Sequence, residues 1–275
     1  MSDNILTIAG IQMGCGADPG ANLERALGLG RVAVERGAKI ICFAECFAWP
    51  WFPRQADQSQ FATAESVPGP LSEAIAAFAR ECQAAVVAPI FERGADAAYY
   101  NTALVFDADG TMLGHYRKNH IPQLQNYQEQ FYFQPGNQGF PVFHTRYATI
   151  GIQISWDNFF PEGSRLLALQ GAELIYAPMS ASVIASAAKW ERAIVGSAVY
   201  NGVFAFRVNR VEGEDGLPFY GKSCCVDPNG DFVVEPSGLS EGVILAEIDL
   251  RWVKTVRDIW PFLQDRRPEI YTGLA

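Results

Sequence analysis

Short apolar runs and amphipathic stretches alternate along the first half of the chain. Residues 5–13, 39–43 and 84–92 are dominated by apolar and β-branched side chains, which predicts buried strands. The spacing of apolar positions predicts helices over 22–36 and 71–83. The N-terminal half is therefore expected to pass repeatedly from strand to helix.

The second half continues this alternation and adds two hairpins. Turn residues interrupt the apolar runs within 101–118 and 226–235, which predicts a pair of antiparallel strands in each segment. Further strands are expected over 171–178 and 202–209, on either side of a helix around 186–200. Strands interleaved with helices indicate an α/β fold, and the hairpins indicate mixed sheets. The pattern alone does not decide between one sheet and two packed sheets.

Composition and charge narrow the class of protein. Of the 275 residues, 49% are hydrophobic and 19% are charged, which is typical of a globular protein. The net charge of −9 argues against a nucleic-acid partner, because phosphate binding needs clustered Lys and Arg. The N-terminus has no basic region followed by a long apolar stretch, and residues 174–188 are uncharged but too few to span a bilayer. We expect a soluble cytoplasmic protein with no membrane partner.

The cysteines give no sign of a metal site. They stand at positions 15, 42, 46, 82, 224 and 225, with no CxxC pair or Cys/His cluster at zinc-ligand spacing. Cys15, Cys42 and Cys82 lie in apolar contexts, which indicates small, reduced core residues. No glycine spacing has the context of a phosphate-binding loop. We therefore expect no metal, nucleotide or flavin cofactor.

Residues 148–162, ATIGIQISWDNFFPE, form the most informative segment of the chain. A run of β-branched and apolar residues ends abruptly at Ser155, and Pro161 and Glu162 then precede a helical pattern. A small nucleophilic side chain at the mouth of a buried strand is suited to covalent catalysis. Ser155 is therefore the candidate nucleophile.

Four other segments accompany Ser155. They are FAECF with Glu45, GHYRKNHIP with Lys118, YQEQFYFQPG with Glu129, and DRRPEIY at 265–271. Together, and in this order, the segments resemble the nitrilase superfamily of carbon–nitrogen hydrolases over nearly the whole chain. The likeness is greatest to the N-carbamoylputrescine amidases and related N-carbamoyl amidohydrolases. In this superfamily the position of Ser155 is a cysteine.

The resemblance implies a fold and an assembly. It implies one carbon–nitrogen hydrolase domain over residues 1–275, folded as a four-layer α–β–β–α sandwich whose pairs commonly form an eight-layer dimer. The segment Val253–Tyr271 mixes Trp260 and Phe262 with arginines, as is often seen at interfaces. We therefore expect a homodimer or a larger even-numbered oligomer.

The resemblance also implies roles for the site residues. An amide carbon is a poor electrophile, so a covalent route divides one hard step into two. Glu45 would take the proton of the nucleophile and later activate water, which a pKa raised by burial favours. Lys118 and the backbone N–H of Trp156 would stabilise the oxyanion, and Glu129 would orient Lys118 and the substrate.

Two further candidates for substrate binding have structural alternatives. Asp157 follows the nucleophile and is a candidate for the pocket, but it could equally fix the turn and cap the next helix. Trp51 lies in the aromatic loop after Glu45, where it could form a pocket wall or pack in the core.

Serine at the nucleophile position is at odds with a Glu–Lys–Cys mechanism. A thiol has a pKa near ~8.5, whereas an alcohol is far less acidic and a glutamate is a mismatched base for it. Three explanations are open: a Cys-to-Ser change introduced to block turnover, a natural inactive homologue, and a natural serine amidase. Cys46 is a poor substitute, because neighbouring residues of an extended segment point to opposite faces.

The substrate class is narrowed by one loop. Residues 177–193 contain no acid before Lys189, although a polyamine substrate would need a carboxylate for its ammonium group. This favours a small neutral or apolar amide or N-carbamoyl compound. Two alternatives remain: a nitrilase that acts on a small nitrile with the same residues, and a non-catalytic binding protein that keeps the pocket.

Overall fold

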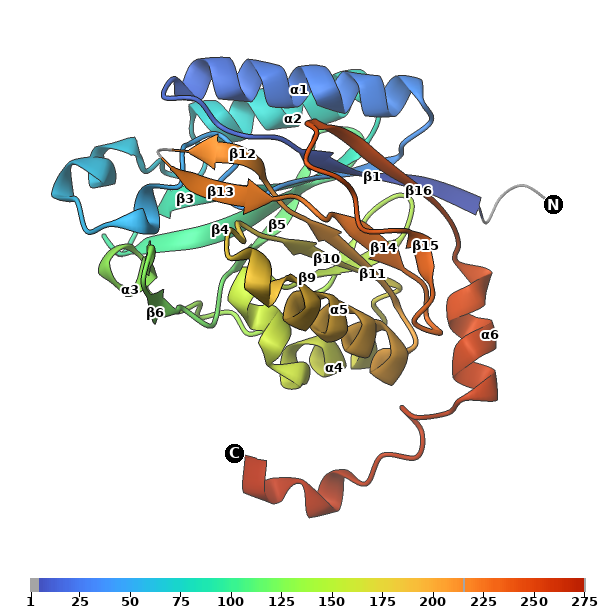
Figure 1. The fold of residues 1–275 in the computed structure, drawn as a ribbon. Coiled ribbons are helices and arrows are strands. Elements are labelled where there is room, and N and C mark those ends of the chain that lie inside the picture. Colours follow the sequence, from blue (N-terminus) through green and yellow to red (C-terminus); the bar gives the residue numbers. More distant parts are fainter. Residues whose placement is uncertain (1–4, 215, 275) are drawn as a thin grey trace.

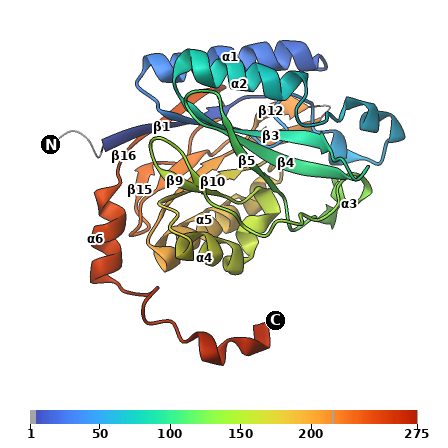
Figure 2. The same cartoon turned by 180° about the vertical axis from the view of Figure 1, so that it is seen from behind.

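Two six-stranded sheets lie face to face in the computed structural model, and helices cover their outer faces (Figures 1 and 2). The structure describes residues 5–214 and 216–274. The strands are β1 Ile5–Gln12, β2 Ile40–Phe43, β3 Ala85–Arg93, β4 Tyr99–Phe106, β5 Met112–Arg117, β6 Gln123–Leu124, β7 Tyr127–Gln128, β8 Phe143–His144, β9 Thr149–Ile152, β10 Leu174–Pro178, β11 Phe204–Val208, β12 Val211–Glu214, β13 Leu217–Tyr220, β14 Cys224–Val226, β15 Phe232–Val234 and β16 Gly242–Asp249. The α-helices are α1 Pro19–Glu35, α2 Pro70–Cys82, α3 Glu129–Tyr132, α4 Pro161–Leu169, α5 Ala187–Asn201 and α6 Arg251–Ile259.

Both sheets are mixed, as the hairpins predicted. The first has the order β16–β1–β2–β3–β4–β5, and the second has the order β15–β14–β11–β10–β9–β8. In each sheet three central strands are parallel, and the strands beside them are antiparallel. Strand β16 was not predicted; it pairs with the whole of β1, from Ile5 opposite Asp249 to Gln12 opposite Gly242.

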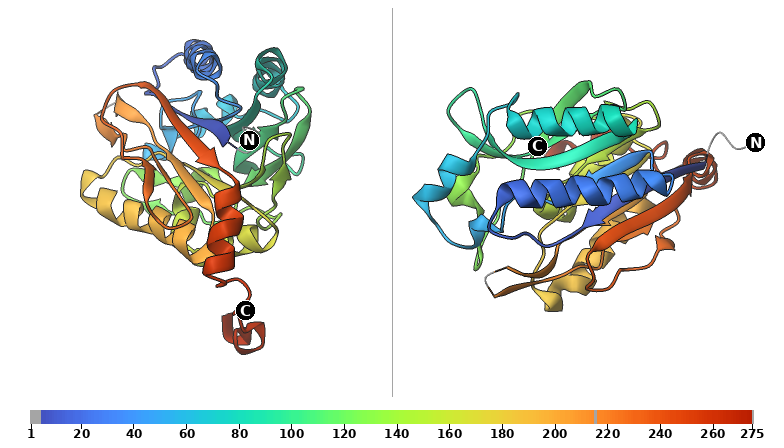
Figure 3. Two further views of the ribbon diagram at one scale, coloured as in Figure 1. Left: turned by 90° about the vertical axis from the view of Figure 1, so that its right-hand side faces the viewer. Right: turned by 90° about the horizontal axis from the view of Figure 1, so that it is seen from above.

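The alternation of side chains along each strand creates three layers of core. In β2, Ile41 and Phe43 pack with α1 and α2, whereas Ile40 and Cys42 face the other sheet. Strand β10 divides in the same way, with Tyr176 between the sheets. Helices α1 and α2 cover the first sheet (Figure 3, right), and α4 and α5 cover the second. The α–β–β–α sandwich that the resemblance implied is confirmed.

The direction of the strands brings Glu45 and Lys118 to the same end of the first sheet, where β2 and β5 terminate. Strand β3 is parallel to β2, and two antiparallel steps through β4 give β5 the same direction again. The carboxyl ends of β2 and β5 therefore point to the same end of the sheet. Glu45 comes two residues after β2, and Lys118 directly follows β5.

The chain leaves the sandwich after α6. The C-terminal segment extends away from the two sheets (Figure 3, left), and Trp260 on it is 57% exposed. Among the described residues, no helix combines the length and the apolar character needed to cross a membrane.

Candidate active site

Three buried ionisable residues, Glu45, Lys118 and Glu129, come from separate segments and lie in contact where β2 and β5 end. The ammonium nitrogen of Lys118 lies 2.8 Å from Oε1 of Glu45 and 2.6 Å from Oε2 of Glu129. All three side chains are almost wholly buried. Burial by itself lowers the pKa of Lys118, but the carboxylates of Glu129 and Glu45 outweigh it and hold that pKa above its ordinary value. Lys118 is therefore a fixed cation that cannot serve as a base near neutral pH.

The two carboxylates differ in how they are held. Burial, together with the nearby charge of Glu45, raises the pKa of Glu129 even though Lys118 opposes the shift. Glu45 shares its Oε1 between Lys118 and the amide of Asn101, which donates a hydrogen bond of 2.8 Å. Its other oxygen, Oε2, is buried and has no hydrogen-bond partner in the described part of the chain. An oxygen left unpaired in this way is available to accept a proton.

The backbone around Glu45 is fixed from the second sheet. Arg210 follows β11 and is fully buried; its guanidinium donates to the carbonyl oxygens of Glu45 at 2.7 Å and Cys46 at 2.6 Å. Asn101 and Arg210 were both missed in the sequence. The signal that could have found them is a polar or charged residue within an apolar strand, as for Asn101, or directly after one, as for Arg210.

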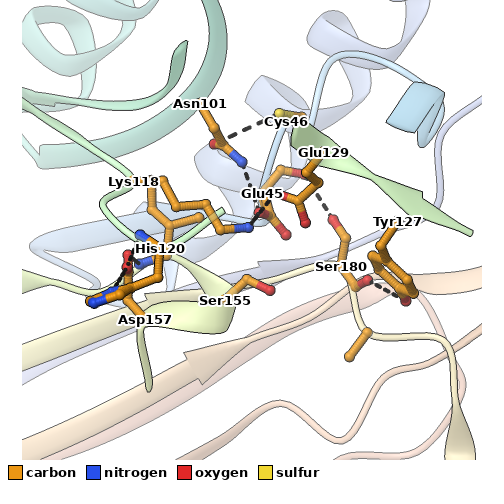
Figure 4. A network of polar contacts seen from close by, with 12 residues as sticks. Glu45, Cys46, Asn101, Lys118, His120, Tyr127, Glu129, Ser155, Asp157 and Ser180 are labelled. Atoms are coloured by element: carbon orange, nitrogen blue, oxygen red, sulfur yellow. Dashed lines mark hydrogen bonds and ion pairs between the residues drawn. The ribbon is translucent and has the colours of Figure 1, made fainter. Parts of the chain in front are cut away.

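Ser155 begins a tight turn at the end of β9. It is the first residue of a 3₁₀ turn over Ser155–Phe159, and its φ of 46° lies in the left-handed region that a residue with a Cβ rarely adopts. Asn158 stabilises the turn by donating a 2.8 Å hydrogen bond to the carbonyl oxygen of Ser155. The side chain of Ser155 is shown beside those of Lys118, Glu45 and Glu129 in Figure 4.

Asp157 links the turn of Ser155 to the segment that carries Lys118. Its Oδ2 accepts from the backbone N–H of Ile154 at 3.0 Å and from the hydroxyl of Tyr116 at 2.7 Å. Its Oδ1 accepts from the backbone N–H of His120 at 3.0 Å and lies 2.8 Å from the His120 ring. Asp157 is fully buried and does not line the cavity described below. Its contacts match the structural alternative rather than substrate binding.

A cavity of about 440 Å³ opens in front of Ser155. Its walls are mainly apolar, with several hydroxyl groups, and they include Ser155, Trp156 and Glu129. The size and lining are those of a site for a small molecule. The remaining lining residues are Pro122, Leu124, Tyr127, Phe159, Ser180, Ala181, Ser182, Val183, Ser186, Lys189 and Trp190.

Trp51 and Cys46 are not among the described residues that line this cavity. The ring of Trp51 packs against that of Tyr127 at 5.6 Å between centroids, and its indole N–H donates to the carbonyl oxygen of Asn126. Trp51 therefore supports a lining residue. Cys46 is fully buried, and its sulfur lies 3.9 Å from Oδ1 of Asn101. Burial raises the pKa of its thiol, which makes Cys46 unsuited to be a nucleophile.

Comparison with known proteins gives the chemical context of this arrangement. The family model for carbon-nitrogen hydrolase matches residues 7–258. An N-carbamoylputrescine amidase of Solanum lycopersicum is 36% identical over 99% of this chain and 95% of its own. A citrullinase of Francisella tularensis is 33% identical over 88% of both chains. The crystal structure of a carbon-nitrogen hydrolase from Helicobacter pylori G27 superposes with a TM-score of 0.91, covers 98% of both chains and is 28% identical.

Proposed function

The chain belongs to the carbon–nitrogen hydrolase family, and we propose that its site is built to cleave a non-peptide C–N bond of a small amide or N-carbamoyl compound. The observation that carries this proposal is the buried Lys118 between Glu45 and Glu129, beside a cavity that Ser155 lines. The N-carbamoylputrescine amidase and the citrullinase support the substrate class, because each is named for a substrate with a carbamoyl group.

The proposed mechanism assigns one task to each residue. Glu45 accepts the proton of the nucleophile at 155 through its unpaired Oε2 as the nucleophile attacks the carbonyl carbon. Glu45 then returns this proton to the leaving nitrogen, so that ammonia or an amine departs and an acyl-enzyme remains. A water molecule gives a proton to Glu45 and attacks the acyl-enzyme. Glu45 then passes this proton to the side-chain atom of residue 155 as its bond to the acyl carbon breaks, which releases the acid and restores both residues.

Lys118 and Glu129 act on charge in this scheme. As a permanent cation, Lys118 stabilises the negative oxygen of each tetrahedral intermediate, together with the backbone N–H of Trp156. Glu129 lines the cavity and holds Lys118 at 2.6 Å, so it can position both the cation and the substrate. This division of roles extends to Trp51 as support for the wall at Tyr127.

Ser155 limits what this chain can do as it stands. A carboxylate is too weak a base for an alcohol, and Lys118 is protonated and cannot replace it. We therefore propose that the Ser155 protein binds substrate but turns it over very slowly. Ser155→Cys should raise the rate of ammonia release by several orders of magnitude, roughly 10³-fold or more, because the nucleophile then matches its base.

The experiment is a comparison of three proteins on one panel of compounds. The Ser155 protein, Ser155→Cys and Ser155→Ala are assayed for ammonia release from linear amides, N-carbamoyl amines, N-carbamoyl amino acids and nitriles. Activity confined to Ser155→Cys supports the proposal, and the preferred compound separates amidase from nitrilase. Equal rates for the Ser155 protein and Ser155→Cys would identify a true serine enzyme if Ser155→Ala is inactive, and chemistry at another site if Ser155→Ala is equally active. No turnover by any of the three would favour the non-catalytic binding protein.

The same proposal includes one domain, a cytoplasmic location and an even-numbered assembly. Both sheets contribute to one core between them, which supports a single domain over residues 1–275. The projecting C-terminal segment exposes Trp260 and Ile270 by 57% and 59%, which favours burial against a second copy. We expect a homodimer or larger by light scattering at micromolar concentration. A monomer there would contradict this part of the proposal.

A further inference from the structure

Lys189 lines the cavity, and the proposed mechanism does not use its charge. Of the residues that line it in the described part of the chain, Glu129 and Lys189 carry charge. Glu129 forms an ion pair with Lys118, which Glu45 also contacts. Lys189, near the start of α5, is exposed and forms no ion pair with the side chains that the structure describes. Of the two charged lining residues, Lys189 is therefore the one whose charge is left for a ligand.

The two charged lining residues differ in their exposure to solvent. Ser155 and Glu129 are 7% and 1% exposed, so the reacting end is the buried one, whereas Lys189 lies toward solvent. The lining as a whole is mainly apolar and includes Trp156 and Phe159. A ligand that extends from the buried nucleophile toward solvent can therefore meet both an apolar wall and the ammonium group of Lys189.

The position of Lys189 is tied to the nucleophile turn by its neighbour. Trp190 is buried, and its ring lies 4.2 Å from the ring of Phe159 and 6.3 Å from that of Trp156, both within the Ser155 turn. These contacts fix the start of α5 against the turn. The backbone of Lys189 is therefore held at a defined place relative to Ser155, and its side chain is exposed.

We infer that Lys189 recognises a carboxylate at the far end of the substrate. This inference rests on the proposed function and narrows its substrate class to linear amides or N-carbamoyl compounds with a distal carboxylate, such as N-carbamoyl ω-amino acids. An ammonium–carboxylate contact is charge-assisted, whereas a distal ammonium would meet a like charge. Because Lys189 is exposed, solvent screens the contact and the effect on affinity is modest.

The test uses three ureas of matched length that differ only in the terminal group. They are N-carbamoyl-5-aminopentanoate (an anion), pentylurea (neutral) and N-carbamoylputrescine (a cation). Dissociation constants are measured by calorimetry on the Ser155 protein, where slow turnover leaves the ligand intact. We expect the anion to bind about three- to fivefold more tightly than pentylurea, and the cation to bind most weakly.

Two lysine variants identify the source of that order. Lys189→Met keeps the length of the side chain and removes its charge, so the three constants should come within about twofold of one another. Lys254→Met is the matched control, because Lys254 is an exposed lysine of α6 outside the cavity, and it should leave the order unchanged. An order that Lys189→Met does not alter, tightest binding of the cation, or no detectable binding of the anion would overturn the inference.

Kinetics separate this inference from the proposed function. In the Ser155→Cys enzyme, Lys189→Met should raise KM for the anion about three- to fivefold with little change in kcat, because the proposed contact of Lys189 is with the unreactive end of the substrate. If Ser155→Cys releases no ammonia from any urea or amide, the proposed function fails. The dissociation constants of the Ser155 protein still decide whether Lys189 selects a carboxylate.

Discussion

Lys118 and Lys189 belong to the two ends of one site and differ in what surrounds them. Lys118 is fully buried, and two carboxylates lie within hydrogen-bonding distance of its nitrogen. Lys189 is exposed and has no ion-pair partner in the part of the chain that the structure describes. The buried lysine is part of a network on which the fold depends, whereas the exposed one can be exchanged without leaving a buried charge unpaired.

We therefore expect the buried end of the site to determine the reaction rate and the exposed end to determine substrate preference. At the buried end, each polar group restrains another: Asn101 holds Glu45, Glu45 and Glu129 hold Lys118, and Asp157 joins the two segments. Changes there are expected to alter both the rate and the stability of the protein. At the exposed end, a single charge faces the cavity, so substrate preference can change while the reacting groups stay in place.

The largest expected effect comes from removing the buried lysine. Lys118→Met in the Ser155→Cys background leaves two buried carboxylates without their shared cation. We expect unfolding to be easier by about 3–5 kcal/mol and activity to fall by roughly 10³-fold or more. Chemical denaturation and ammonia release measure the two effects. Lys189→Met is the matched control and should change the free energy of unfolding by less than about 0.5 kcal/mol.

Glu45→Gln should lower the reaction rate strongly and leave the stability of the protein nearly unchanged. A glutamine has the shape of Glu45 and can still accept from Asn101 and Lys118 through its carbonyl oxygen. It cannot take a proton, so activity in the Ser155→Cys background should fall by about 10²–10⁴-fold. Lys118 keeps Glu129 as a partner, so stability should change by about 1 kcal/mol or less. A fully active Glu45→Gln enzyme would remove Glu45 from the mechanism.

Asp157→Asn should have a smaller effect that extends to both properties. The carboxylate accepts hydrogen bonds from Ile154, Tyr116 and His120, and an amide can replace only part of this pattern. We expect a loss of about 1–3 kcal/mol in the free energy of unfolding and roughly a tenfold fall in kcat with little change in KM. A large rise in KM at unchanged stability would instead return Asp157 to the substrate-binding role that the sequence suggested.

The sequence predicted most strands and helices because their apolar periodicity is local. The continuous apolar runs of β2 and β10 are visible in a few consecutive residues, and the hairpin at 101–118 carries its own turn. Strand β16 was missed, because its place is fixed by pairing with β1 at the other end of the chain. The number of layers was predicted only from the family resemblance, because no local pattern shows which face of a strand packs against a second sheet.

The candidate site, too, was predicted only in part from the sequence. Glu45, Lys118, Glu129 and Ser155 were singled out from motifs, and the structure brings the first three into contact and places Ser155 in the cavity that Glu129 also lines. Their roles remain proposals. The functions of Asn101, Arg210 and Asp157 depend on contacts across 37 to 165 positions of sequence, which no short motif encodes. Lys189 was noticed only as the end of an acid-free loop.

The smallest expected effect is that of salt, which should weaken binding at the exposed Lys189 and leave the buried Lys118 unaffected. Between about 0.05 and 0.5 M salt, the screening length falls from roughly 14 to 4 Å, which weakens contacts made by exposed charges. Affinity of the Ser155 protein for N-carbamoyl-5-aminopentanoate should fall about threefold, whereas that for pentylurea should stay within about 1.5-fold. Lys189→Met should remove the salt dependence of the anion. The ion pairs of Lys118 are buried, so salt should leave kcat of the Ser155→Cys enzyme nearly constant. An anion whose affinity does not respond to salt would show that its carboxylate lies away from the exposed lysine.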